Sequence, residues 1–112
     1  MRVQSHGFLV RQAAPAGKPI RCELVIILRG SVEHCGFAEP ATHAELLFLS
    51  DTEAATHPPE YSEPARRIRV WYPTPHLPAV MQMLRKKKDL HCFYYEYDGT
   101  FAEGGLKNWV SP

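Results

Sequence analysis

Apolar and polar side chains alternate with a period of two along much of this chain, which is the pattern of half-buried β-strands. Residues 20–29, IRCELVIILR, give the clearest case, because every second side chain from Ile20 to Leu28 is apolar or cysteine. Residues 44–50 and 67–72 continue the pattern. The alternation predicts strands in these segments, and a further strand in residues 3–10.

A hairpin is predicted near the end of the chain. Residues 90–97, LHCFYYEY, are rich in aromatic side chains and lead into Asp98-Gly99, a strong short-range hairpin signal. Residues 100–102 are expected to return as a short partner strand, which Gly104-Gly105 would end.

One segment has helical periodicity instead. Within residues 77–87, four apolar side chains fall at i, i+3, i+4 and i+7: Leu77, Val80, Met81 and Leu84. Thr74-Pro75 offers an N-cap and a first-turn proline. The basic residues that follow suit the carbonyl-rich end of the helix.

The predicted order of elements is β-β-β-β-α-β-β, which indicates an α+β fold. We expect a mainly antiparallel, strongly curved sheet of five or six strands with one helix packed on one face. The 112 residues suit a single domain, 1–112, and no internal repeat is visible. Within it, residues 51–64 are acidic and contain three prolines, so they are predicted to form a long exposed loop.

Apolar residues also occupy the second face of several predicted strands, for example Val25, Ile27, Leu47 and Leu49. One short helix cannot cover both faces of a sheet, and large exposed apolar patches are rare on monomers. Curvature of the sheet, a second subunit or an apolar ligand could cover the second face. The sequence favours strong curvature combined with a homodimer.

Composition and charge exclude several classes of protein. The longest purely apolar runs are far shorter than the ~20 residues that span a bilayer, and the N-terminal residues lack a secretory signal. Three cysteines suggest a reducing compartment, so a cytoplasmic, non-membrane protein is expected. The net charge of +1 conceals an acidic segment, 23–63, with eight acids and one base, and a basic segment, 66–88, with seven bases and no acid.

A candidate catalytic cluster lies in residues 31–43, which are expected to form a loop. Glu33, His34, Cys35 and His43 could provide a Cys-His pair or a His-Glu acid-base pair. No hydrolase, nucleotide-binding or zinc spacing motif is present, so no metal site and no cofactor are predicted.

Binding is the better-supported class of function. The strand predicted at 90–97 places Phe93, Tyr95 and Tyr97 on one side, and Trp71 of a neighbouring strand could join them. Glu96 could attract a cationic ligand to these rings. The sequence therefore predicts a small module that binds an apolar or cationic ligand or a protein partner. The alternatives are a small enzyme that uses the 33–43 loop, and a single-stranded nucleic-acid binder, which the acidic segment disfavours.

Overall fold

The computed structural model describes residues 1–13, 16–17, 21–31, 40–54, 56–86, 89–97, 99 and 101–108. The strands in these residues are β1 (Arg2–Ala13), β2 (Arg21–Ser31), β3 (His43–Leu49), β4 (Glu60–Ser62), β5 (Arg67–Pro73), β6 (His91–Tyr97) and β7 (Phe101–Lys107). A short helix, α1 (Asp51–Ala54), follows β3, and a 3₁₀ turn, η1 (Thr74–His76), leads into the longer helix α2 (Leu77–Lys86).

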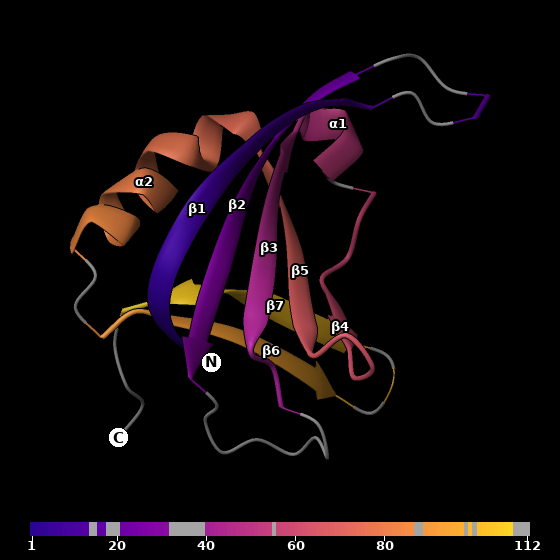
Figure 1. The fold of residues 1–112 in the computed structure, drawn as a ribbon. Helices are drawn as coiled ribbons and strands as arrows, with labels where there is room; N and C mark the ends of the chain where they lie inside the picture. The colour runs from indigo at the N-terminus through magenta and orange to yellow at the C-terminus, as the bar shows by residue number, and fades with distance from the viewer. Residues whose placement is uncertain are drawn as a thin grey trace.

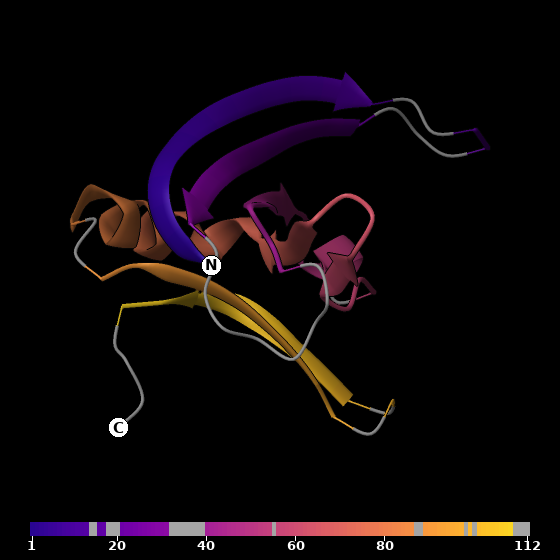
Figure 2. The ribbon, with the colours of Figure 1, turned by 60° about the horizontal axis from the view of Figure 1, so that its bottom comes forward.

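The strands form one mixed sheet in the order β4-β5-β3-β2-β1-β6-β7. Only the pair β3–β5 is parallel among the described strands, and the other neighbours are antiparallel. β1 and β2 bend strongly, and β6 and β7 cross below them, so the sheet is curled like a nearly closed barrel (Figures 1 and 2). The α+β class and the curved, antiparallel-rich sheet are thus confirmed, but the sheet has seven strands instead of five or six.

The parallel pair explains the long segment after β3. Two parallel neighbours need a crossover connection of a dozen or more residues, and the chain between Leu49 and Arg67 provides it. The segment 51–64, predicted as an exposed loop, contains α1 and the edge strand β4. Ala54 of α1 is buried, so part of this segment packs against the sheet.

The inner face of the curled sheet carries the hydrophobic core. The core residues are Ile26, Leu28, Ala41, Ala44, Leu46, Phe48, Ile68, Val70, Val80, Leu84, Leu90 and Cys92. Burial of each Leu or Ile stabilises the fold by about 1.5–3 kcal/mol relative to an exposed side chain. The core thus packs α2 together with residues of β2, β3, β5 and β6.

The helix α2 covers the inner face as its periodicity predicts. Val80 and Leu84 are buried in the core, and Leu77 and Met81 pack against it. Thr74 does not cap α2 as predicted; it lies in η1, and its Oγ1 donates a hydrogen bond to the Leu49 carbonyl oxygen at 2.9 Å. Among the described residues, no helix is long and apolar enough to cross a membrane.

On β2 and β3 the outer face of the sheet is largely covered within one chain. Val25, Leu47 and Leu49 expose 1%, 6% and 4% of their surface. α1 packs against β3 and β5, so this part of the second apolar face is covered without a second subunit. Large exposed apolar side chains lie elsewhere, at Phe8, Leu9 and Val10 on β1, and at Tyr95, Tyr97 and Phe101 on the β6–β7 hairpin.

Candidate functional site

The β6–β7 hairpin positions most of the predicted binding residues. β6 and β7 pair antiparallel from His91↔Lys107 to Tyr97↔Phe101. Between the two strands, Gly99 has a φ of 69°, a left-handed conformation that glycine adopts without strain. The hairpin signal of the sequence is therefore confirmed.

The two faces of this hairpin have different surroundings. Cys92 is fully buried in the core, and its cross-strand partner Leu106 packs against the core. Because successive side chains of a strand point to opposite faces, the side chains of Phe93, Tyr95 and Tyr97 lie on the outer face. In Figure 2 the β6–β7 ribbon lies apart from the β1–β2 arch, on the opposite side of the molecule.

Four rings lie on this outer face as two contacting pairs, which we call the aromatic row: Phe93, Tyr95, Tyr97 and Phe101. The Phe93 and Tyr95 ring centroids are 5.4 Å apart, and so are those of Tyr97 and Phe101. Tyr95, Tyr97 and Phe101 expose 45%, 47% and 57% of their surface. The structure thus brings three predicted residues together with Phe101, a residue the prediction omitted.

Charged side chains of β7 frame the row. The Lys107 Nζ lies 5.5 Å from the Phe93 ring centroid and 5.7 Å from that of Tyr95, and it donates a hydrogen bond to the Tyr95 hydroxyl at 3.4 Å. The Tyr97 hydroxyl donates to Glu103 Oε1 at 2.9 Å, and this hydrogen bond raises the pKa of Tyr97. These hydrogen bonds hold Tyr95 and Tyr97 in place, and Lys107 lies over one side of the Phe93 and Tyr95 rings.

Glu96 lies on the other face of β6, because it alternates with Tyr95 and Tyr97. Its carboxylate accepts a hydrogen bond from Tyr94, whose ring stacks on Tyr61 of β4 at 5.9 Å. Burial, followed by the charges of Glu96 and Glu60, raises the pKa of Tyr94. The carboxylate that borders the aromatic row is therefore Glu103 rather than Glu96.

Trp71 belongs to a different surface. Its neighbours in β5, Val70 and Tyr72, face β7, where they approach Gly104 and Gly105. Trp71 alternates with them onto the outer face of β5, and its ring stacks on that of His57 at 5.0 Å with an interplanar angle of 17°. The structure therefore does not place Trp71 in line with the aromatic row.

Of the four residues in the candidate catalytic cluster, the structure describes only His43. Glu33, His34 and Cys35 lie outside the described residues. His43 pairs across the sheet with Arg29 and with Arg67, and burial together with these cations lowers its pKa. A histidine with a lowered pKa stays neutral near pH 7, so His43 could accept a proton, but the catalytic pairing itself remains a prediction.

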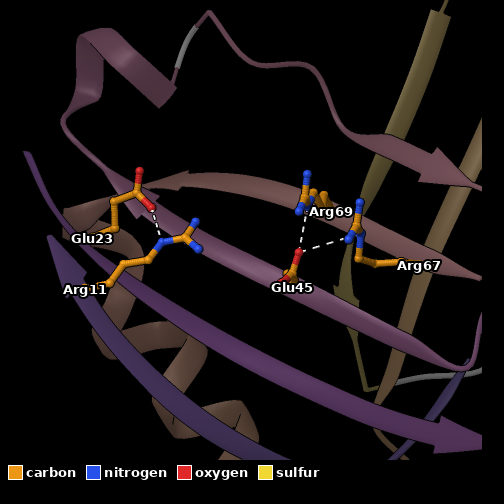
Figure 3. Close-up of polar contacts among 5 residues, drawn as sticks. All are labelled: Arg11, Glu23, Glu45, Arg67 and Arg69. Carbon is orange, nitrogen blue, oxygen red and sulfur yellow. Dashed lines mark hydrogen bonds and ion pairs between the residues drawn. The ribbon is translucent and has the colours of Figure 1, made fainter. Parts of the chain in front are cut away.

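Next to His43, the acidic and basic segments of the chain meet. Glu45 Oε1 lies 2.6 Å from Arg69 Nε and 3.6 Å from Arg67 Nε, so one carboxylate bridges two guanidinium groups (Figure 3). Part of the basic segment is therefore paired within the fold. Among the described residues, no group of three or more His, Cys, Asp or Glu side chains is placed to hold a metal ion.

Sequence reasoning missed the contribution of β7. The strand was predicted to end before Gly104-Gly105, but it continues through both glycines to Lys107. A Cβ at Gly104 would lie 3.0 Å from the Pro59 Cβ, and one at Gly105 would lie 2.9 Å from the Tyr72 hydroxyl. These glycines allow β5 to approach β7 closely. The sequence signal that could have predicted the full length of β7 is the alternation of Phe101, Glu103 and Lys107, which share one face.

Comparisons with protein-family models, with curated proteins and with solved structures found no match to this chain.

Proposed function

We propose that this protein is a small binding module that recognises a protein partner through the aromatic row on the outer face of β6–β7. The observation that carries the proposal is the exposure of Tyr95, Tyr97 and Phe101, each near half of its surface. By contrast, Leu46 and Phe48 on the inner face are buried. Clustered exposed aromatic residues are characteristic of protein interfaces.

The shape of the surface favours a macromolecule over a small ligand. The row lies along the outside of a two-stranded ribbon, whereas small-molecule sites enclose most of their ligand. An apolar or aromatic segment of a partner could lie along all four rings and bury them together. Rigid rings provide a large contact area at a low cost in conformational entropy.

The charges around the row favour the same partner. Lys107 already occupies the cation–π position over Phe93 and Tyr95, so a cationic ligand would have to displace it. Glu103 lies beside Tyr97 and would repel the phosphates of a nucleic acid. An uncharged aromatic or aliphatic segment is repelled by neither Lys107 nor Glu103, and an acidic residue next to that segment could pair with Lys107 when it moves off the rings.

The test uses peptides selected from a displayed random library against the immobilised full chain, with binding measured by fluorescence polarisation. In the triple variant Tyr95→Ser, Tyr97→Ser and Phe101→Ser, the Kd of the selected peptides should rise by at least about tenfold, because the exposed rings supply the contact. Urea unfolding of the variant verifies that it still folds.

Val10→Ser is the control, since it removes an exposed apolar side chain from a different surface. Equal affinities for the wild type and the triple variant would contradict the proposal, as would an equal loss in the control. Salt-sensitive binding of short single-stranded oligonucleotides, with no binding of peptides, would support the nucleic-acid alternative instead.

A further inference from the structure

The outer edge of β1 is a second surface available for association, separate from the aromatic row. β1 pairs with β2 along its whole length, from Arg2↔Ser31 to Ala13↔Arg21. It pairs with β6 only at Arg2↔His91, and Figure 2 shows the rest of β1 as the outermost arc of the molecule. Within the described residues, no strand pairs with the second edge of β1 after Arg2.

The hydrogen bonds of the neighbouring strands show which backbone groups point outward. His43 N–H donates to the Arg66 carbonyl in the direction of β5, and Gly30 N–H donates to the Thr42 carbonyl in the direction of β3. Alternation then directs the backbone groups of Val25 and Ile27 toward β1, where they face Leu9 and Gly7. The N–H and C=O groups of the alternate β1 residues, His6, Phe8, Val10 and Gln12, therefore point to the open edge.

A bulge accounts for the change of direction in β1. The register shifts between Val3 and Ser5, and before this point the Val3 N–H donates to the Leu90 carbonyl next to β6. One extra residue reverses which backbone groups point outward and bends the strand. β1 thus leaves β6 at the bulge, and its open edge begins after it.

The side chains along this edge are apolar. Phe8, Leu9 and Val10 expose 53%, 39% and 74% of their surface. Proteins usually protect a long exposed edge with lysine, proline or a bulge along it, because an unprotected edge pairs with other strands. Between Ser5 and Val10 there is no charge and no proline, and the bulge lies at the end of the edge.

We propose that β1 pairs antiparallel with β1 of a second copy of this chain, about a two-fold axis at Leu9. In this register Leu9 faces Leu9 of the partner subunit on the outer face of the sheet. Phe8 faces the partner's Val10 on the inner face, and Val10 faces the partner's Phe8. Each exposed apolar side chain of the edge then has an apolar cross-strand partner, and such pairs stabilise antiparallel strands.

The charges of the strand also suit a second copy. In this register Arg11 faces Gly7 of the partner subunit, so no like charges are opposed. Arg11 Nε lies 2.8 Å from Oε2 of the buried Glu23, which compensates its charge within each chain (Figure 3). A two-fold axis at Phe8 would instead place Leu9 opposite the partner's Gly7 and Val10 opposite the partner's His6. It therefore pairs fewer apolar side chains.

Disulfide crosslinking tests the register. At Leu9 the two strands would form a non-hydrogen-bonded pair with Cα atoms about 4.5 Å apart, within the range that a disulfide spans. In a background of Cys22→Ser and Cys35→Ser, which retains the buried Cys92, the Leu9→Cys variant should form a covalent dimer under mild oxidation. The matched control is Gly7→Cys, because a Cβ at Gly7 meets no atom within 4 Å.

In the control, the two cysteines would lie four residues apart along the strands, about 13 Å, which is too far for a disulfide. Crosslinking of Leu9→Cys no faster than of Gly7→Cys would overturn the proposed register.

Sedimentation of the uncrosslinked protein tests the edge itself. Val10→Pro removes an outward N–H and leaves the hydrogen bonds to β2 in place, so it should weaken association by about tenfold or more. Val10→Thr keeps the N–H and the β-branched shape, and it should associate as the wild type does. Monomers at all concentrations for the wild type, or equal dimerisation of Val10→Pro, would overturn the proposal. Circular dichroism verifies the fold of each variant.

Discussion

At the scale of single residues, burial keeps a cysteine thiol and a tyrosine hydroxyl of the inner sheet face protonated. Cys92 is completely buried, and burial raises the pKa of its thiol from 9.0 to about 12. Burial, and then the proximity of Cys92, raises the pKa of Tyr72 from 10.0 to about 12, although a hydrogen bond from the Leu106 backbone opposes the shift. Both groups therefore make the fold sensitive to alkaline pH.

We predict that the free energy of unfolding decreases as the pH rises from about 9 toward 12. In this window the unfolded chain releases the protons of Cys92 and Tyr72 while the folded chain still holds them. Deprotonation thus favours the unfolded state. Urea titrations at a series of pH values measure the slope, which the double variant Cys92→Ala, Tyr72→Phe should reduce. An unchanged slope in the variant would show that other groups cause the alkaline loss.

Two glycines of the β1–β2 pair differ in the space that surrounds them. At Gly30 a Cβ would overlap the backbone carbonyl of Arg2 on the adjacent strand, whereas a Cβ at Gly7 meets nothing within 4 Å. Backbone atoms cannot move aside as a flexible side chain can. Gly30 is therefore required by the close approach of β1, and Gly7 is not.

We predict that Gly30→Ala lowers the free energy of unfolding by about 3 kcal/mol, and that Gly7→Ala changes it by no more than about 0.5 kcal/mol. Chemical denaturation of both variants under identical conditions gives the comparison. Similar effects of the two substitutions would contradict the crossing of β1 over Gly30.

At the scale of elements, periodicity predicted what one strand or helix determines for itself. The strands β2, β3, β5 and β6 and the stripe of α2 follow from alternating or helical spacing within each segment. The edge strand β4, the parallel pairing of β3 with β5, and the full length of β7 depend on contacts between distant segments. Gly104 and Gly105 show the difficulty, because the same residues can end a strand or permit a close approach.

For the candidate site, too, the sequence predicted what lies within one strand and missed what depends on pairing between strands. Alternation in β6 placed Phe93, Tyr95 and Tyr97 on one face, whereas Lys107 and Glu103 join them only through the register of β7. Sequence analysis grouped Trp71 with these rings because β5 and β6 both contain several aromatic residues. The side of β5 on which Trp71 lies follows from the contacts of Val70 and Tyr72 with β7, which are long-range.

At the scale of the whole molecule, curvature changes the meaning of the apolar content. The outer face of β2 and β3 is mostly covered within the chain, whereas exposed apolar residues are concentrated on the β1 edge and the aromatic row. The acidic and basic segments also meet inside one chain, at Glu45 with Arg67 and Arg69. Association is therefore expected at the β1 edge and at the aromatic row rather than across the outer face of β2 and β3.

The central claim is that partners bind at the aromatic row, and amide chemical-shift mapping by NMR tests it most directly. The full chain, labelled with ¹⁵N, is titrated with the library-selected peptides. The account predicts that the largest shifts fall on Phe93, Tyr95, Tyr97, Phe101 and Lys107, the outer face of β6–β7. Largest shifts elsewhere, for example around His43 and Arg67 on the outer face of β3 and β5, would contradict it.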